Sequence, residues 1–256
     1  LARFGDKVVC IWTIVNRDLR NENITSPFDI FPYVEIAYSI YNGTWSSPII
    51  LTNNSEFEFN LDVYSDNENI SIAWEVDKDL NFSTFNDRVV KLSLLNGTSL
   101  LEISNATKPS LAGNYIVYYN PVDNKLNFAS ISPFEVITSY NVSDVVDLDL
   151  SCYNNSCTLV WIGNFEIFYA NPPNSAVKLD SNLSAYTIDV EDFGNYKLLV
   201  FSGKSPGDVR QRIFYRIGYN GYNNTWIDER ALAGGTNLTF WQTSYAYDNS
   251  GFLAVF

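Results

Sequence analysis

A short apolar strand that ends in an aromatic residue returns six times along the chain, and this repeat restricts the possible folds more than any other feature. The six copies end at Trp12, Trp74, Tyr118, Trp161, Phe201 and Phe256. Each copy follows a turn residue, in order Gly5, Asn67, Gly113, Asn154, Gly194 and Asn249. The aromatics are 40 to 62 residues apart, and a four-stranded propeller blade needs about 40 to 50 residues. The repeat therefore predicts an all-β chain, a β-propeller of four-stranded blades with about five to six blades present.

Turn signals divide the chain into six blade-like units, and no stretch of ten or more residues has helical periodicity. We expect the units to span residues 1–53, 54–106, 107–142, 143–184, 185–235 and 236–256. The third unit is expected to have three strands, at residues 115–119, 126–131 and 134–138. Other expected strands include residues 7–15, 34–41 and 145–153. A pair of β-sandwiches is the runner-up, because short strands at regular spacing suit both folds. All 256 residues are expected to form one propeller-like domain.

The two ends of the chain do not match as a closed ring. The first unit is expected to start near its second strand, and the last one stops within its second strand. Open sheet edges invite association. We therefore expect the chain to be part of a longer polypeptide, or to have its edges covered by partner molecules.

Asn-X-Ser/Thr sequons, the acceptor sites of N-glycosylation, are far more frequent than composition predicts. The chain has 30 Asn, and 39 of its 256 residues are Ser or Thr. Chance pairing of these residues gives about 4 to 5 sequons, whereas 12 are present. These residues also gather in turns, but turns alone hardly produce such an excess. We therefore expect N-linked glycans on a secreted protein. The acceptor residues are Asn23, Asn42, Asn53, Asn69, Asn81, Asn96, Asn105, Asn141, Asn154, Asn182, Asn223 and Asn237.

Three cysteines fit the same compartment. Cys152 and Cys157 bracket a four-residue loop between two strand-like runs, so their sulfurs could face each other across a hairpin. A disulfide is favoured over two free thiols, and a metal pair is disfavoured because the chain has no second cysteine pair and no His. We expect Cys10 to be a buried thiol, with pairing to a segment outside this chain as the alternative.

Charge and composition exclude several classes of partner and reaction. The formal net charge is −13 with no His, and phosphate binding needs clustered Lys and Arg, so nucleic acid is not an expected partner. Without His, Ser-His-Asp and Cys-His hydrolysis are excluded within this chain. No apolar run approaches 18 residues, so no transmembrane segment is expected in it. The chain opens on Leu1 without a leader, and we expect a mature product whose signal peptide has been removed.

Two turns resemble the repeats of sialidase-like, Asp-box β-propellers. They are Asn42-Gly43-Thr44-Trp45, followed by an apolar strand, and Asn223-Asn224-Thr225-Trp226. Asn42 and Asn223 stand where the box has glycine, and Ile40 and Gly221 stand where it has its aspartate. The resemblance implies the propeller architecture. In that family the box is structural, so it does not imply activity.

The residues that glycoside chemistry would need are present only in part. A sialidase-like site would need arginines from several blades, but Arg210, Arg212 and Arg216 fall in one region. Paired carboxylates could serve a glycosidase, and the candidate groups are Asp147 with Asp149 and Asp189 with Glu191 and Asp192. We expect these pairs to solvate a sheet face or to bind calcium weakly. Likewise, we expect the aromatic pairs to pack in the core rather than to stack on sugars. They are Tyr118-Tyr119, Phe168-Tyr169 and Tyr245 with Tyr247.

We expect a structural function and no enzymatic activity. The protein is predicted to be a glycosylated component of a surface layer, filament or adhesive coat, located outside the cell at its surface. Its expected partners are N-linked glycans and other surface proteins or copies of itself, and no cofactor or metal is expected. Dense sequons, many Asn, Tyr and Ser, and no His or Met resemble the composition of surface glycoproteins of thermoacidophilic archaea. In strong acid the carboxylates would be protonated.

Two alternatives stay open from the sequence. One is a propeller that binds or cleaves carbohydrate, which a funnel of carboxylates and aromatics would favour. The other is an accessory propeller of a secreted peptidase, with the catalytic part outside these residues.

Overall fold

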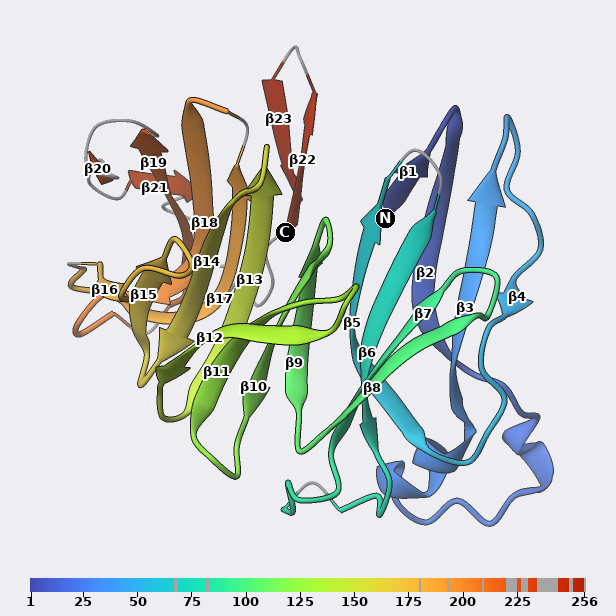
Figure 1. Ribbon diagram of the computed structural model, residues 1–256. Coiled ribbons are helices and arrows are strands. Elements are labelled where there is room, and N and C mark those ends of the chain that lie inside the picture. Colours follow the sequence, from blue (N-terminus) through green and yellow to red (C-terminus); the bar gives the residue numbers. More distant parts are fainter. Residues whose placement is uncertain are drawn as a thin grey trace. The chain divides into compact units, whose positions relative to one another are not determined.

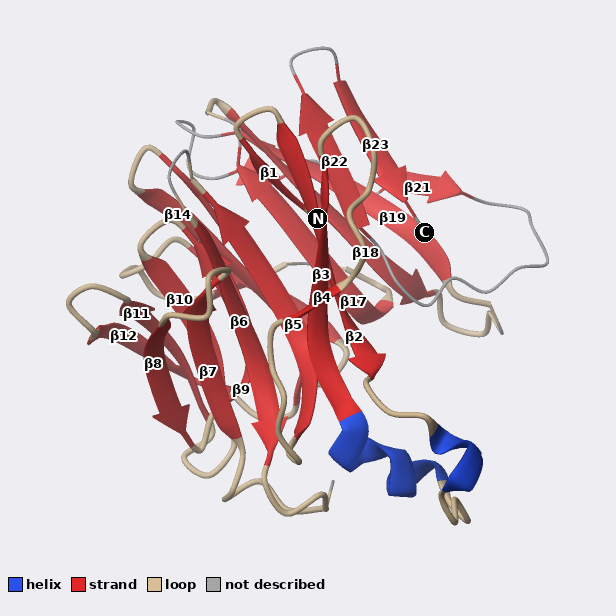
Figure 2. Ribbon diagram, turned by 90° about the vertical axis from the view of Figure 1, so that its right-hand side faces the viewer, coloured by secondary structure: helices blue, strands red, loops and turns tan. Residues whose placement is uncertain are grey.

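The chain is built almost entirely from antiparallel strands (Figures 1 and 2). The computed structural model describes residues 1–66, 69–81, 83–179, 181–192, 194–208, 210–219, 225–226, 230–233, 244–248 and 251–255. The helical segments in this part of the chain are two 3-10 turns, η1 (Leu19–Asn21) and η2 (Pro27–Tyr33), in the long connection after the second strand. Among these residues, no helix has the length and apolar character needed to cross a membrane.

The chain divides into two compact units, each described separately below. Unit 1 holds residues 1–125 and 130–135, and unit 2 holds residues 126–129 and 136–256. The sheets follow one another along the sequence, and neighbouring strands are consecutive in the chain except where residues 230–233 pair with the third strand of the fifth sheet. That meander order is the topology of a propeller blade, whereas a β-sandwich exchanges strands between sheets through Greek-key connections.

The first two sheets lie in unit 1. The first sheet contains β1 (Ala2–Phe4), β2 (Lys7–Val15), β3 (Val34–Tyr41) and β4 (Ile49–Ile50). The second contains β5 (Phe57–Ser65), β6 (Ile70–Asp77), β7 (Val89–Leu94) and β8 (Ser99–Ser104). The third sheet has β9 (Thr107–Ala112), β10 (Tyr115–Asn120), β11 (Lys125–Ser130) and β12 (Glu135–Asn141).

Unit 2 holds the remaining sheets. The fourth sheet contains β13 (Val145–Tyr153), β14 (Ser156–Gly163), β15 (Glu166–Ala170) and β16 (Val177–Lys178). The fifth contains β17 (Ser184–Asp192), β18 (Tyr196–Lys204), β19 (Arg212–Tyr219) and β20 (Thr225–Trp226), and β21 (Arg230–Ala233) also pairs with β19. A last pair joins β22 (Ser244–Asp248) to β23 (Gly251–Val255).

Each of the six blade-like segments predicted from the sequence contains one sheet, so the predicted blade boundaries are confirmed at the level of whole sheets. Two details of the prediction were wrong. The first predicted blade begins at its first strand, because residues 2–4 pair with β2. The third predicted blade has four strands rather than three, because β9 was missed. Pro109 interrupts that strand, and proline is tolerated there because β9 lies at the edge of its sheet.

In each of the first four sheets, the last strand is the most exposed one. The second strands β6, β14 and β18 are buried over almost their whole length, whereas β4 and β16 are exposed. Strands buried on both faces read as continuous apolar runs, which is why the sequence repeat is so clear. Its described aromatics lie in these second strands, and Trp161 and Phe201 are fully buried. Burial of one such side chain contributes roughly 1.5–3 kcal/mol.

Each unit has its own apolar core between neighbouring sheets. In unit 1, Val9 and Ile36 of the first sheet pack with Ile72 of the second. In unit 2, Ile162 of the fourth sheet packs with Ile188 and Phe201 of the fifth. These cores hold neighbouring sheets face to face within a unit.

Candidate functional site

The structure places the sequon asparagines at the ends of strands and in the loops that join them. Of the ten that lie in the described residues, nine are exposed and Asn105 is half-buried. Asn141 is the last residue of β12, and the other nine lie outside the strands. The sequons that begin at Asn223 and Asn237 lie outside the described residues. No described sequon asparagine belongs to a buried core, so each of these side chains can be modified without removing an apolar contact.

Two of these asparagines have their side-chain amide oriented by their own sequon. Asn96 Oδ1 accepts a hydrogen bond from the Thr98 backbone N–H at 2.9 Å, and Asn81 Oδ1 accepts one from the Ser83 N–H at 3.1 Å. In both, the carbonyl end of the amide is engaged. The Nδ2 atom, which would carry a glycan, points away from that bond.

The predicted disulfide between Cys152 and Cys157 is confirmed. The two residues face each other across the β13–β14 hairpin, with a Cα–Cα distance of 4.1 Å. The loop that they close contains Asn154, whose φ of 49° is the left-handed conformation that asparagine tolerates in tight turns. Cys10, in contrast, is a free thiol and is half-buried, less deeply than predicted.

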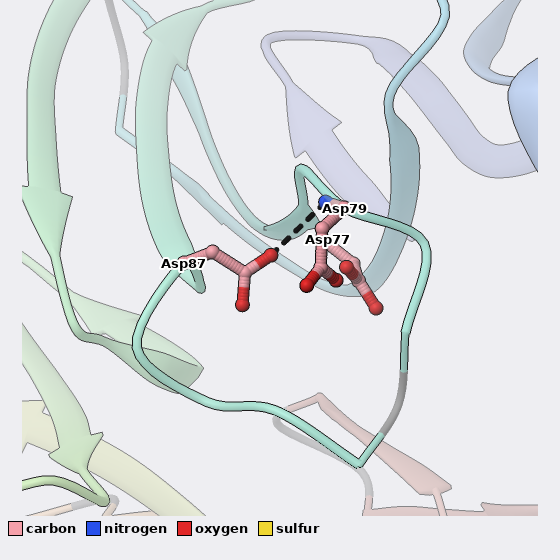
Figure 3. A group of neighbouring side chains, drawn as sticks. All are labelled: Asp77, Asp79 and Asp87. Atoms are coloured by element: carbon pink, nitrogen blue, oxygen red, sulfur yellow. Dashed lines mark hydrogen bonds between the residues drawn. The ribbon is translucent and has the colours of Figure 1, made fainter.

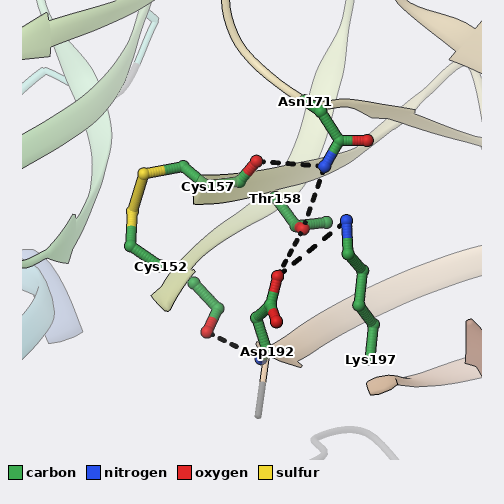
Figure 4. The surroundings of a disulfide bond; sticks show 7 residues. Cys152, Cys157, Thr158, Asn171, Asp192 and Lys197 are labelled. Carbon is green, nitrogen blue, oxygen red and sulfur yellow. Dashed lines mark hydrogen bonds and ion pairs between the residues drawn. A yellow bond between two sulfur atoms is a disulfide. The ribbon is translucent and has the colours of Figure 1, made fainter. Parts of the chain in front are cut away.

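Next to the disulfide lies a buried polar chain that joins the fourth and fifth sheets (Figure 4). Asn171 Nδ2 donates to the Cys157 carbonyl oxygen at 3.1 Å and to Thr158 Oγ1 at 3.2 Å. Thr158 Oγ1 donates in turn to Asp192 Oδ2 at 3.2 Å. Lys197 Nζ lies 3.9 Å from the same oxygen. These polar groups pack inside unit 2. The Asp192 carboxylate is therefore a buried structural group and is not exposed to solvent.

Burial shifts the pKa values of two charged groups, Glu191 near the end of β17 and Lys197 near the start of β18. Desolvation, aided by the negative charge of Asp192, raises the pKa of Glu191 to about 7. Desolvation also lowers the pKa of Lys197, and the Asp192 carboxylate offsets part of that change.

Asp147 and Asp149 are half-buried in β13, and their side chains accept backbone hydrogen bonds instead of only solvating a sheet face. Asp147 Oδ2 accepts from the Ile188 N–H at 2.9 Å, and Asp149 Oδ2 accepts from the Val190 N–H at 2.8 Å. Ser151 Oγ continues the series by accepting from the Asp192 N–H at 2.9 Å. Alternate side chains of β13 therefore bind alternate backbone amides of β17, a contact that we call the β13–β17 ladder. Its partners lie 41 residues apart in the chain, beyond the reach of any local pattern.

One aspartate of this kind recurs at a fixed place in the repeat. Asp62, Asp149 and Asp189 each lie twelve residues before the aromatic of their copy. Each of them pairs with a residue on the second strand of its own sheet, in order Ala73, Val160 and Val200. That partner is the residue just before the aromatic. Asp62 Oδ2 accepts from the Leu111 N–H at 2.6 Å, the same use as in Asp149. The spacing was visible in the sequence, although its meaning needed the strand register.

A group of carboxylates at the end of β6 is the described cluster that could hold a metal ion (Figure 3). Asp77, Asp79 and Asp87 offer ligand oxygens that all lie within 4.8 Å of one another. Asp77, Asp79 and Asn81 have the spacing of the first three ligands of an EF-hand loop. Sequence reasoning missed this order.

The rest of that loop departs from a calcium site. Phe82 stands where the EF-hand requires glycine, and Arg88 stands where it has its bidentate glutamate. Arg88 is buried, and its guanidinium lies 2.9 Å from Glu75 Oε1 and 3.1 Å from Asp77 Oδ2. The positive charge that a cation would supply to Asp77 therefore comes from a side chain. Within the cluster, Asp87 Oδ2 accepts from the Asp79 backbone N–H at 3.0 Å. We call Arg88 with Glu75 and Asp77 the charge network at the end of β6.

The remaining candidates also have structural positions. Arg212 pairs with Asp208 at 2.9 Å, and Arg216 is buried in β19. The expectation that aromatic pairs pack in the core is confirmed where they are described: Tyr118, Tyr119 and Tyr169 are buried, and Phe168 stacks on Trp161 at 5.6 Å between ring centroids. The side chains of Tyr245 and Tyr247 lie outside the described residues.

Comparison with known proteins shows similarity in structure alone. No protein-family model matches the chain, and no curated protein matches it in sequence. It is similar to TolB from Acinetobacter baumannii, with a TM-score of 0.52 and 12% identity over 87% of this chain and 56% of that one. It is also similar to the Dos1 propeller, with a TM-score of 0.50 and 11% identity over 82% of this chain and 59% of that one. A third similar structure is a complex of KlAtg21 with the coiled-coil of AgAtg16, with a TM-score of 0.50 and 10% identity over 77% of this chain and 65% of that one.

The chain spans between 56% and 65% of the length of these three structures. At such low identity the likeness carries the fold and no activity. Consecutive antiparallel sheets of four strands, joined by short turns, are the blades that this likeness implies. The chain is therefore all-β and has the β-propeller fold.

Proposed function

We propose that this protein is a structural extracellular glycoprotein, a component of a surface layer, filament or adhesive coat, and that it is not an enzyme. The observation that carries the proposal is the placement of the sequons. Twelve sequons occur where about 4 to 5 are expected by chance, and all ten in the described residues lie at strand ends or in loops. Nine of their asparagines are exposed.

Glycan attachment at these sites requires only the exposed amide. The Asn Nδ2 atom forms a bond to the anomeric carbon of a sugar, the bond from that carbon to the phosphate of an activated sugar donor breaks, and Nδ2 loses one proton. The Cys152–Cys157 disulfide is consistent with the oxidising compartment where this chemistry takes place.

The use of the charged groups supports the non-enzymatic part of the proposal. Asp147 and Asp149, one of the two candidate carboxylate groups, accept hydrogen bonds from backbone amides of β17. Asp192 lies within a buried polar chain. Carboxylates with such structural partners are poorly suited to proton transfer to a substrate.

An exposed apolar edge supports association with other copies or other surface proteins. Tyr41, Trp45, Ile49 and Ile50 are all exposed at the outer side of the first sheet, and the Tyr41 and Trp45 rings lie 5.3 Å apart. β4 is a short edge strand, and exposed edges with apolar side chains favour pairing with another chain. The alternatives, a carbohydrate-directed propeller or an accessory propeller of a peptidase, rest on the sequence alone.

The test is glycopeptide and intact-mass spectrometry on the protein purified from its natural source without reduction. We expect glycans on most of the 12 sequons and a Cys152–Cys157 link in the same preparation. A bare chain with free thiols would overturn the proposal. A screen of sugar ligands and glycoside substrates would then become the next experiment.

A further inference from the structure

A pocket of about 280 Å³ opens in unit 1 where the first sheet meets the second. β1, β2 and β3 supply one wall, and β6 with the β7–β8 turn supplies the other. The apolar part of its lining includes Phe4, Val9, Tyr38, Ile40, Ile70 and Leu95. Its polar residues are Lys7, Asn69 and Asn96. This size is at the lower end for ligand pockets, which hold about 300 Å³ or more, so the pocket suits one small ring.

Two of these three polar residues are sequon asparagines. Asn69 directly precedes β6, and Asn96 lies in the turn between β7 and β8. The Leu95 N–H donates to the Ile70 carbonyl oxygen at 2.9 Å. The two asparagines lie next to these paired residues, Asn69 just before Ile70 and Asn96 just after Leu95. Both are exposed. A glycan on either of them would begin at the mouth of the pocket.

Asn96 is the better attachment point of the two. All three residues of its sequon are exposed, and Gly97 turns the chain with a φ of 86°. Asn96 Oδ1 is held by the Thr98 N–H at 2.9 Å, which fixes the amide plane. The Asn69 sequon, in contrast, continues into β6 through the buried Ile70. Asn69 is therefore suited to contact the sugar rather than to carry it.

We propose that this pocket holds the first sugar ring of a glycan linked to Asn96. The inference rests on the proposed function, because it requires that the sequons are glycosylated. A pyranose has faces of C–H groups and a rim of hydroxyls. Its faces can pack on Tyr38 and the aliphatic wall, and its hydroxyls can pair with Lys7 Nζ and the Asn69 amide. The covalent link gives the sugar an effective concentration of millimolar order, so weak contacts are sufficient to seat it.

Asn42 provides a matched control within the chain. Its sequon has the same sequence, Asn-Gly-Thr, and lies in an exposed turn after β3 with Gly43 at a φ of 81°. Asn42 does not line this pocket. Because the two sites share the sequon and a glycine turn, a difference between Asn96 and Asn42 does not come from the sequon itself, and a change in the pocket lining then tests the contribution of the pocket.

The experiment follows glycan release from the folded glycoprotein by an amidase that hydrolyses the sugar–asparagine bond, with site-resolved mass spectrometry over time. A sugar seated about nine-tenths of the time would be released about tenfold more slowly from Asn96 than from Asn42. The Tyr38→Ala variant should remove this difference, and so should prior unfolding. Because Tyr38→Ala could impair folding, Thr98→Ala gives a second test. It removes the Asn96 glycan and should accelerate amide exchange at Val9 and Ile70, whereas Thr44→Ala should not.

The outcomes separate the inference from the function on which it rests. Equal release from Asn96 and Asn42, with both occupied, overturns the inference and leaves the glycoprotein proposal standing. A bare Asn96 beside other occupied sequons has the same consequence. If all sequons are bare, both proposals fail.

Discussion

At the scale of single residues, Arg88 supplies the positive charge that faces two buried carboxylates. It lies within ion-pair distance of Glu75 and Asp77, and all three are almost fully buried. Replacing it with methionine keeps much of the apolar stem but leaves two buried carboxylates without their counter-charge. Removing one partner of a buried ion pair costs about 3–5 kcal/mol. We expect Arg88→Met to lower the free energy of unfolding by about that amount, measured by urea denaturation.

An exposed ion pair gives the matched comparison. Arg20 lies 2.5 Å from Asp18, and both side chains are largely exposed. Exposed pairs contribute little because water and salt screen them. Arg20→Met should therefore leave the urea midpoint essentially unchanged. If Arg88→Met behaved like Arg20→Met, the charge network at the end of β6 would not be structural, and its carboxylates would need another counter-ion.

At the scale of strands, the β13–β17 ladder predicts a coupling between two neighbouring sheets of unit 2. Asp149→Ala leaves the Val190 N–H without its acceptor, and an unsatisfied buried polar group costs about 1–3 kcal/mol. We expect that loss in the free energy of unfolding, together with faster hydrogen exchange at Val190. Asp149→Asn keeps an oxygen in place and should restore most of the stability.

Glu135 is the control for this prediction, because it is an exposed acidic strand residue outside the ladder. Glu135→Ala should change neither the unfolding midpoint nor exchange at Val190. Equal effects of Asp149→Ala and Glu135→Ala would show that the ladder does not hold β17 in place.

The strands themselves could be predicted because their signals are local. Apolar runs that end in an aromatic fix the second strands, and turn residues fix the limits of the sheets, so β2, β3 and β13 were bounded correctly. The partner of Asp149 lies on the next sheet, and the ion pair of Arg88 with Glu75 joins the loop before β7 to β6. No sequence period encodes such contacts. Consequently, the sequence alone could not show that Asp147 and Asp149 accept hydrogen bonds from β17.

At the scale of the whole molecule, buried acids make stability depend on pH in an unusual direction. Burial raises the pKa of Glu58, Asp62 and Asp77 above the ordinary carboxyl value, and it raises that of Glu191 from 4.5 to about 7. The folded state therefore binds protons more tightly than the unfolded chain does. Stability from these groups is fully present below the unfolded pKa, and it is lost as the pH rises through the folded pKa. Asp29 acts in the opposite sense, because the backbone amides of Thr25 and Ser26 lower its pKa.

We therefore expect the free energy of unfolding to fall between pH 4.5 and pH 7, the reverse of the usual acid sensitivity. For Glu191 the expected contribution is about 1–3 kcal/mol, given its partial exposure. Urea denaturation across this range checks the slope. Glu191→Gln should make the slope smaller by the contribution of this one group, because the amide does not titrate, while Glu135→Gln should leave the slope unchanged. A stability that rises across the window would mean that these acids are ionised at little cost in the fold. A decline toward neutral pH would instead be the behaviour of a protein suited to an acidic exterior.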